Sequence, residues 1–411
     1  MAEKYPIANG NWNNPAIWNG GTVPLADDDV YGNGFSVTIN QNVTVLSIRT
    51  TAGSVAVAGG TFLVTTGRTI SANIISGTTP CLTTNVNAVG SQTITINGNI
   101  TASSTTVNAR GWAVFNSGYD IIVNGNVTAG SVVTGNAHGI LLNAANNLTV
   151  NGNVRGGPAS SNSGIATASG APVVNITVNG EVRGGDADSS YGINHACAGL
   201  ITVNNGTADA VIGGTVAGLS IGIRLTGTGR FAVTGNVLAS LIARGILSSS
   251  TQTGNTIIGN ITAAGVVGVE MTGSGFGLTT TGDAFGGTGT NAHGINLTVA
   301  GTLVHNGNAK GGSGTTARGI NNASTGTVNV TGFAIGADNT GGVGVFNAST
   351  GLVTIGGARF GLQGWPPYAG IVHFNSLDAA TTRIVRADLT TRDLQSGAFI
   401  PNYSMNGGFT E

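Results

Sequence analysis

A repeat of about 26 residues, found through most of the chain, constrains its fold more than any other feature. The phrase "VNGNVRGG" at 150–157 returns as "VNGEVRGG" at 178–185. A second phrase, with a glycine inside a short apolar run, alternates with it, as in "HGILL" and "HGINL". Both phrases keep the same period, so they mark a single repeated unit. The glycines of the second phrase lie at 111, 139, 164, 192, 222, 245, 268, 294, 319, 344 and 370, so ten intervals cover 259 residues.

Each repeat contains two or three runs of β-branched or aliphatic residues, separated by Gly, Asn, Ser and Thr. The composition fits strands: 70 of 411 residues are glycine and only 8% are charged, too few for the solvated faces of helices. Propeller blades need ~40 or more residues, and the Leu-Asn spacing of leucine-rich repeats is missing. The repeat predicts an all-β, right-handed, single-stranded parallel β-helix, a solenoid of about 11 or more coils that is capped at both ends.

The phrase "V-N-G-N-V" predicts the corner of each coil. Its Asn-Gly pair suits a turn in which glycine takes a positive φ. Amides repeated on successive coils, ~4.8 Å apart, can bond one another, so we expect an Asn ladder along the solenoid. The second asparagine of the phrase supplies its members: Asn99, Asn126, Asn153, Asn236, Asn260 and Asn308.

The ends of the chain depart from the repeat. We expect residues 1–45 to form an N-terminal cap and the start of the β-helix, which then covers residues 46–376. Residues 377–411 are richer in charge and suit either a closing cap or a docking or oligomerisation segment. A β-helix end exposes strand edges and an apolar cross-section, so it needs a lid.

Near the start, Trp12 and Trp18 are the candidates for that lid. The acidic run Asp27–Asp29 follows them. It suits a turn better than a Ca²⁺ site, because consecutive side chains point in different directions. No metal site or cofactor is expected anywhere in the chain.

One acidic cluster could carry chemistry. A glycosidase needs two carboxyl groups ~5–9.5 Å apart. The stretch "EVRGGDADSS" supplies weak catalytic candidates, and it also reads as a solvated loop. Arg155 should lie one coil below Arg183, and Glu181 is the expected acidic neighbour of this pair. The candidates are Glu181, Asp186 and Asp188.

The residue before each repeat glycine forms a column that could contact a glycan or a neighbouring subunit. The alternative is a set of exposed turn residues. His138 and His293 share the phrase "NAHGI", but at six coils apart, ~29 Å, they cannot share a metal ion. The polar members of the column are Arg110, His138, Tyr191, Arg244, His293 and Arg318.

Several function classes are disfavoured. A net charge of −1 argues against broad binding to nucleic acid or to anionic membranes. The start "MAEKYPIANG" lacks the apolar segment of a signal peptide, and no apolar run is long enough to span a membrane. Cys81 and Cys197 should lie about four coils apart, ~20 Å, so we expect two buried free thiols.

The opening "GNWNNPAIWNGGTVP" with "DDDVYGNGFSVTINQNVTV" resembles the start of G8-type β-helix proteins. It is also similar to β-helical structural proteins of tailed bacteriophages. The latter resemblance implies a component of the virion surface or tail, usually a homotrimer, used for host attachment or decoration. We therefore expect a non-enzymatic virion protein, a fibre, spike or surface decoration. Its partners would be further copies of itself, other virion proteins docked through a terminus, and possible host glycans. Two alternatives stay open: a tailspike polysaccharide depolymerase (a glycosidase or a lyase) and a secreted bacterial adhesin.

Overall fold

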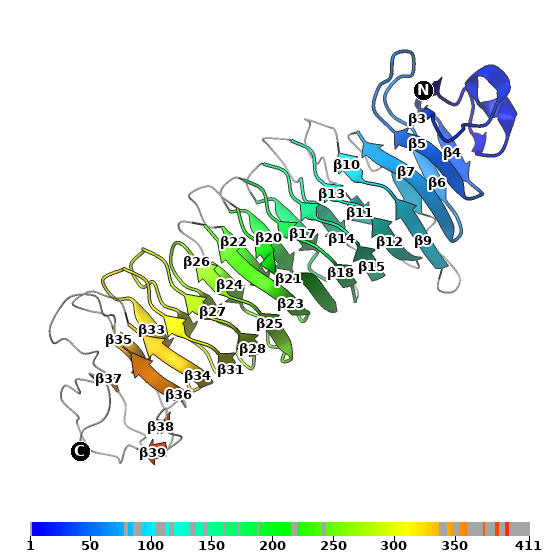
Figure 1. Cartoon of the computed structure of the whole chain (residues 1–411). Helices are drawn as coiled ribbons and strands as arrows, with labels where there is room; N and C mark the ends of the chain where they lie inside the picture. The colour runs from blue at the N-terminus through cyan, green and yellow to red at the C-terminus, as the bar shows by residue number, and fades with distance from the viewer. Residues whose placement is uncertain are drawn as a thin grey trace. The chain divides into compact units, whose positions relative to one another are not determined.

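The computed structural model describes residues 2–77, 81–84, 92–102, 112–114, 119–131, 137–142, 147–158, 161–170, 173–186, 189–214, 220–240, 244–336, 343–347, 353–359, 373–374, 383–385 and 391–393. The chain divides into two compact units, Met1–Asn204 and Asn205–Glu411. Nearly all of the described secondary structure is β-strand, with two short 3-10 helices near the start (Figure 1).

Unit 1 contributes strands to three parallel sheets and contains both 3-10 helices, η1 (Pro15–Ile17) and η2 (Asn19–Gly21). Its first sheet contains β1 (Glu3–Lys4), β3 (Asp29–Tyr31), β5 (Val43–Arg49), β7 (Arg68–Ser76), β9 (Gln92–Asn97), β10 (Ile100–Ala102), β12 (Tyr119–Asn124), β13 (Val127–Thr128), β15 (Asn147–Val150), β16 (Val154–Arg155), β18 (Asn175–Val178), β19 (Val182–Arg183) and the start of β21 (Leu200–Ile212). Its second sheet contains β11 (Trp112–Val114), β14 (Ile140–Leu142), β17 (Ser163–Thr167) and β20 (Tyr191–His195), and its third contains β2 (Gly10–Asn11), β4 (Ser36–Ile39), β6 (Thr61–Val64) and β8 (Leu82–Thr84).

Unit 2 contains strands of two sheets. The first contains β23 (Arg230–Ala239), β25 (Asn255–Ile258), β26 (Ile261–Ala263), β28 (Gly277–Thr281), β29 (Ala284–Phe285), β31 (Thr302–Asn306), β32 (Ala309–Lys310), β34 (Thr327–Ile335), β36 (Val353–Arg359), β38 (Arg383–Val385) and β39 (Thr391–Asp393). The second contains β22 (Ile221–Leu225), β24 (Arg244–Ser248), β27 (Val269–Met271), β30 (Ile295–Leu297), β33 (Arg318–Asn322), β35 (Val343–Asn347) and β37 (His373–Phe374).

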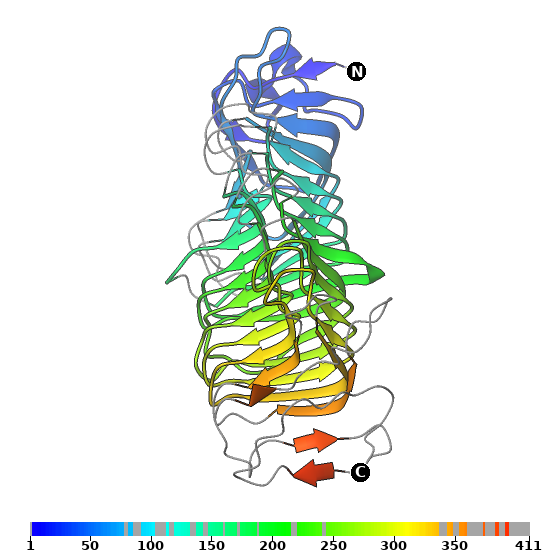
Figure 2. The ribbon, with the colours of Figure 1, turned by 90° about the vertical axis from the view of Figure 1, so that its left-hand side faces the viewer.

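The predicted parallel β-solenoid is confirmed in both units. Equivalent strands of successive coils pair in parallel, and the antiparallel pair β38–β39 is the exception among the described strands (Figure 2). Strands of the second kind number four in unit 1 and seven in unit 2 among the described residues, in agreement with the repeat count. Among the described residues, no helix is long and apolar enough to cross a membrane.

Inward-facing apolar residues alternate with outward-facing residues along each strand, so aliphatic side chains stack in columns inside the solenoid. In unit 1, β9, β12, β15, β18 and β21 place one such column in register, and each member is at most 2% exposed. A fully buried aliphatic side chain contributes ~1.5–3 kcal/mol, so these columns are the main source of stability. The members are Ile94, Ile121, Leu148, Ile176 and Ile201.

The corner glycines differ from expectation in unit 1. Gly98 and Gly125 do not adopt the left-handed φ that the sequence suggested. Glycine is needed there because the neighbouring coil leaves no room for a side chain. A Cβ on Gly125 would lie 2.3 Å from the carbonyl oxygen of Gly98 in the coil below. In unit 2 the expectation holds at Gly235, with a φ of 124°, and at Gly282, with a φ of 120°, but not at Gly307 or Gly332. Coil-to-coil contact therefore selects glycine at some corners, and backbone conformation selects it at others.

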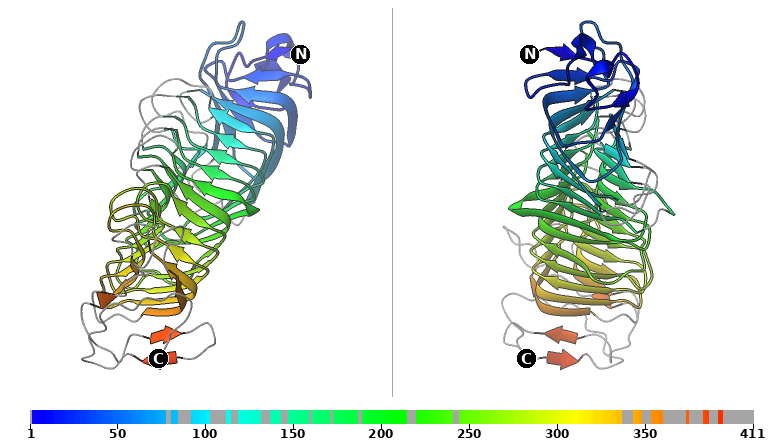
Figure 3. Two further views of the ribbon diagram at one scale, coloured as in Figure 1. Left: turned by 60° about the vertical axis from the view of Figure 1, so that its left-hand side comes forward. Right: turned by 90° about the vertical axis from the view of Figure 1, so that its right-hand side faces the viewer.

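The first strand of unit 1 is covered. Asn19 of η2 accepts a hydrogen bond from the backbone N–H of Tyr5 at 2.9 Å and donates one to the carbonyl oxygen of Glu3 at 3.2 Å. Lys4 also donates to the Thr22 hydroxyl at 2.6 Å. These bonds occupy polar groups beside β1, where an open strand edge would otherwise invite pairing with another chain. Figure 3 shows the dark blue N-terminal segment at this end of unit 1.

Candidate functional site

The predicted Asn ladder exists, but on the first asparagine of each "N-G-N" corner. Asn97 donates to the Ser71 hydroxyl at 3.2 Å, and each later side-chain amide of this column donates to the amide oxygen one coil earlier, at 2.7–3.1 Å. The members lie on the outer surface of unit 1, where the strand ends. This amide ladder consists of Asn97, Asn124, Asn151, Asn179 and Asn204.

The second asparagines have a different role, which corrects the prediction that their amides bond one another. The side-chain oxygen of Asn99 accepts a hydrogen bond from the backbone N–H of Asn126 at 2.9 Å, and Asn126 does the same for Asn153 at 2.8 Å. We call this column the acceptor ladder. The next step runs from Asn153 to the backbone N–H of Glu181, at 2.8 Å. An oxygen is all that this position requires.

Unit 2 repeats the acceptor ladder and shows what it tolerates. The side-chain oxygen of Asn236 accepts a hydrogen bond from the backbone N–H of Asn260 at 3.0 Å, and that of Asn260 accepts one from the backbone N–H of Asp283 at 2.8 Å. Asp283 then accepts from the backbone N–H of Asn308 at 2.7 Å, and Asn308 accepts from that of Phe333 at 2.9 Å. A carboxylate thus replaces an amide where only an acceptor is needed.

The densest charge cluster among the sequence candidates lies at a corner of unit 1. Arg155 of β16 and Arg183 of β19 are register partners on successive coils, as predicted. Asp186 binds both guanidinium groups, with Oδ2 2.9 Å from Arg155 and Oδ1 3.3 Å from Arg183. We call Arg155, Arg183 and Asp186 the corner cluster.

The corner cluster corrects the expectation that Glu181 neutralises the arginines. Asp186 lies three residues after Arg183 and reaches back to both charges, whereas no ion pair joins Glu181 to either arginine within the described part of the chain. Asp188, the third catalytic candidate, lies outside the described residues. Arg155 keeps about half of its side chain exposed, and the Nε of Arg183 is buried without a partner among the described residues. The cluster therefore retains donors that no described residue occupies.

The two "NAHGI" histidines share a structural role, each within its own unit. His138 accepts a hydrogen bond through Nδ1 from the backbone N–H of Ser163 at 3.0 Å. His293 accepts one from that of Arg318 at 3.2 Å. The reading of both as exposed turn residues is wrong for His293, which is 3% exposed. Burial and the nearby Arg318 charge lower the pKa of His293 to about 4, so the ring is a neutral acceptor.

The arginines of the predicted column in unit 2 fold onto a polar row on the second sheet. Arg244 forms an ion pair with Glu270, whose other oxygen accepts from Asn296 at 3.1 Å. Asn296 in turn accepts from Asn321 at 2.7 Å. Arg318 completes the row by bonding Asn321. Its guanidinium carbon also lies 3.6 Å from the ring centroid of Phe346, a cation–π contact.

The candidate binding residues therefore lie one above another on successive coils, and their exposure differs from residue to residue. Ser163 and Tyr191 are register partners in unit 1, and Ile221 and Arg244 are partners in unit 2. Tyr191 is half-buried. Arg110 lies outside the described residues. The structure gives several column members coil-to-coil contacts, and whether any of them also binds a ligand stays a prediction.

At the start of unit 1, the tryptophans form a buried pair. Trp12 and Trp18 are each 1% exposed, with ring centroids 5.1 Å apart in an edge-to-face arrangement. Trp18 donates its indole N–H to the carbonyl oxygen of Trp12 at 2.8 Å, and Trp12 also packs near Phe62 of β6. This cluster belongs to the apolar interior near the first coils, and its role as a lid stays a prediction.

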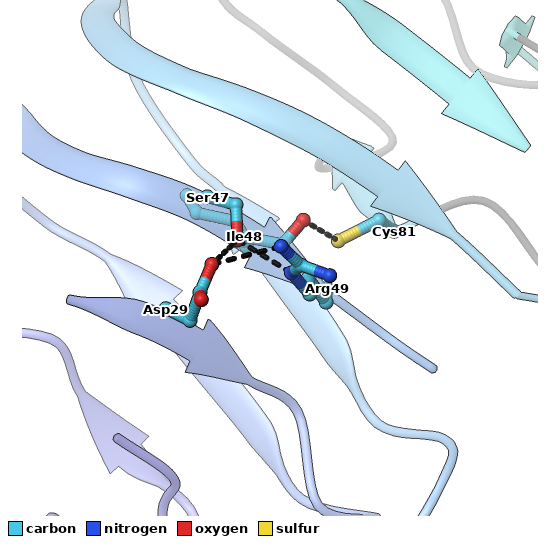
Figure 4. Close-up of polar contacts among 5 residues, drawn as sticks. All are labelled: Asp29, Ser47, Ile48, Arg49 and Cys81. Atoms are coloured by element: carbon cyan, nitrogen blue, oxygen red, sulfur yellow. Dashed lines mark hydrogen bonds and ion pairs between the residues drawn. The ribbon is translucent and has the colours of Figure 1, made fainter. Parts of the chain in front are cut away.

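The acidic run makes separate contacts. Asp28 accepts from the backbone N–H of Leu25 at 2.8 Å, and Asp27 is exposed. Asp29 binds the hydroxyl of Ser47 and, at 2.9 Å, the guanidinium of Arg49 (Figure 4). Nowhere in the described ranges do three or more His, Cys, Asp or Glu side chains gather in a way that could hold a metal ion.

Both cysteines are free and buried, as expected. Cys81 lies 3.6 Å from the carbonyl oxygen of Ile48 (Figure 4). The Sγ of Cys197 lies 3.9 Å from Nδ1 of His195. Burial raises the pKa of both thiols. They are therefore protonated in the folded chain and poor nucleophiles.

Sequence reasoning missed the interior histidines. His195 contacts the Thr167 hydroxyl at 3.0 Å through Nδ1, and its Nε2 lies 3.4 Å from the carbonyl oxygen of Gly199. His305 repeats the arrangement with the Thr280 hydroxyl and the carbonyl oxygen of Asn308. Burial lowers the pKa of His195 to about 4 and also lowers that of His305. Strand alternation was the available signal, since both occupy inward positions.

Comparison of the chain with models of protein families, with curated proteins and with solved structures gives no match.

Proposed function

We propose that the protein is a non-enzymatic structural β-solenoid of a tailed-bacteriophage virion, of the fibre or spike kind, that serves in host attachment. The structural role is supported by the hydrogen bonds that the polar side chains form. The amide ladder, the acceptor ladder and the polar row of unit 2 all join one coil to the next. Such bonds stiffen a stack of coils and leave few of these groups free for chemistry.

Three of the described carboxylates support a non-enzymatic role in the same way. Both oxygens of Asp186 bind arginines, both oxygens of Glu270 are bonded, and Asp283 holds the next coil. A glycosidase instead needs one carboxyl free to deliver a proton and a second placed to act on the sugar.

The virion assignment rests on the resemblance of the opening stretch to β-helical phage proteins. The attachment role draws support from the corner cluster. Two guanidinium groups share one described carboxylate there, and arginine binds carboxylate or sulfate groups well because of its forked donors. An acidic surface glycan of the host suits this chemistry.

The direct test is location. Antibody labelling of purified phage particles that carry this gene, followed by electron microscopy, should place the protein on the tail or on the surface of the particle. Particles without label on any surface, or label on bacterial cells that carry no phage, would contradict the virion assignment.

The attachment contact has its own test. Binding to an acidic polysaccharide, with polygalacturonate as probe and neutral dextran as reference, should fall at least tenfold in the double variant Arg155→Gln/Arg183→Gln. Arg230→Gln, an exposed arginine of unit 2, is the matched control and should bind as the wild type does. Release of oligosaccharide that disappears in Asp186→Asn would favour a depolymerase instead.

A further inference from the structure

One outer surface of unit 1 is built as a regular lattice of uncharged polar side chains. It comprises the outward positions of β9, β12, β15, β18 and the start of β21, each extended to its ladder asparagine, and we call it the Asn–Thr face. Three columns run from coil to coil, two residues apart along each strand. The amide ladder is the outermost column, and the central one contains Thr95, Ile122, Thr149, Thr177 and Thr202.

The first column of the Asn–Thr face adds a further ladder. Asn147 donates to Asp120 at 2.8 Å and Asn175 donates to Asn147 at 3.1 Å. The backbone N–H of Leu200 then binds the Asn175 oxygen at 3.1 Å. The side chains on both flanks of the threonine column are therefore fixed in place, so the face is rigid.

The charge of the Asn–Thr face is unusually low for an exposed surface. Of its fifteen positions seven are Asn and five are Thr, while Asp120 alone is charged. Soluble domains carry ~25–35% charged residues on their surfaces, and exposed sheets commonly use Lys or Glu to prevent association. Every one of the fifteen side chains is exposed or half-buried. The face thus lacks the usual protection against packing with another sheet.

The amides also retain bonding capacity. A side-chain amide has two N–H donors, and the ladder uses one of them for the preceding coil. The second N–H of Asn124, Asn151 and Asn179 has no partner among the described residues. One free donor per coil therefore repeats at ~4.8 Å, beside a row of threonine hydroxyls.

A second copy of this chain has the same repeat, so its lattice matches in every coil once one coil is aligned. Five coils at ~4.8 Å and the five residues that the three columns span at ~3.3 Å give ~400 Å² per copy. Two copies then bury ~800 Å², the size of a weak, reversible contact.

We propose that the Asn–Thr face of unit 1 packs against another copy of the same chain. This inference rests on the proposed function, because the phage proteins that the opening stretch resembles are usually homotrimers, and it adds the surface that makes the contact. Threonine hydroxyls and free amide N–H groups supply the hydrogen bonds, and the near absence of charge keeps the desolvation cost low.

Sedimentation velocity on the full chain, over about 1–100 µM, tests the proposal because this range brackets the concentrations at which a weak, reversible contact associates. The wild type should associate reversibly with rising concentration. Thr149→Lys/Thr177→Lys places two like charges in the centre of the face and should leave the chain monomeric throughout. No described hydrogen bond uses either threonine side chain, so circular dichroism should stay unchanged, and repulsion between the two register partners should lower the melting temperature only slightly.

The matched control adds the same two charges elsewhere in unit 1. Val55→Lys/Val57→Lys alters side chains that are 68% and 61% exposed outside the Asn–Thr face, and it should associate as the wild type does. A monomeric wild type, or association lost in the valine variant and kept in the threonine variant, would overturn the proposal. Neither result bears on particle location, so failure here is distinguishable from failure of the proposed function.

Discussion

Glu3 shows how much one side chain can organise at the start of unit 1. Its carboxylate accepts hydrogen bonds from three consecutive backbone N–H groups, those of Ser54, Val55 and Ala56, at 2.7–2.9 Å, and from the Ser54 hydroxyl. The N–H of Ala56 first, and then the Ser54 hydroxyl, lower the pKa of Glu3 to about 2. A loop that carries two exposed valines is thereby tied to the first strand.

We predict that Glu3→Gln loosens this loop at neutral pH. An amide oxygen accepts more weakly than a carboxylate, so the amide hydrogens of residues 54–56 should exchange about tenfold faster in the variant. In the wild type the pKa is lower in the folded chain, so the stabilisation is present above pH ~4.5 and is lost as the pH falls towards ~2. Hydrogen exchange followed by mass spectrometry measures the first effect. Equal exchange rates in the two proteins would refute it.

Among the secondary-structure elements, the two asparagine columns require different hydrogen-bonding roles of two residues in the same corner. Asn124 must donate to Asn97 and accept from Asn151. Asn126 must only accept, from the backbone N–H of Asn153. The same residue type two positions apart is thus needed for two different reasons.

We expect Asn124→Asp to lower the free energy of unfolding by about 1–2 kcal/mol, because the donor is lost and a carboxylate then faces the Asn97 oxygen. Asn126→Asp keeps the acceptor and should change the stability by less than ~0.5 kcal/mol, as the presence of Asp283 in the acceptor ladder indicates. Urea unfolding at pH 7 measures both. Equal losses in the two variants would mean that the columns do not differ as described.

The repeat predicted the solenoid because spacing and alternation are properties of the sequence itself. It could not assign the ladder correctly, because both asparagines of "N-G-N" are outward and polar, and only the path of the backbone decides which amide meets its neighbour. The sequence also named Asp186 as a catalytic candidate. Its ion pairs with arginines of two coils could not be predicted, because they depend on the conformation of the loop after Arg183. The buried histidines could have been found, since alternation places His195 and His305 on the inward side.

In the molecule as a whole, buried neutral histidines occur in both units. His195 lies in unit 1, and His293 and His305 lie in unit 2. Burial is the main cause of the lowered pKa in each, and for His195 and His293 the value is about 4. The unfolded chain takes up these protons near pH 6.5, whereas the folded chain resists them until the pH is far lower.

We therefore predict that the free energy of unfolding falls as the pH is lowered from about 6.5 to about 4, with the full contribution present above that window. His293→Gln keeps an acceptor for the Arg318 N–H and removes one proton site. It should reduce the difference in stability between pH 7 and pH 4.5 by about 2 kcal/mol. Urea unfolding at the two pH values gives the comparison. An unchanged difference would show that His293 is protonated equally in both states.

The hydrogen bonds of the acceptor ladder all point the same way along the chain. In every described step the side-chain oxygen belongs to the earlier coil and the backbone N–H to the later one. A nascent chain emerging from the ribosome would therefore find, on each finished coil, acceptors already set in place for the coil still being synthesised. Assembly from the opposite end would begin on a surface without them. Folding of this chain should thus proceed vectorially with translation, each coil serving as the template for the next.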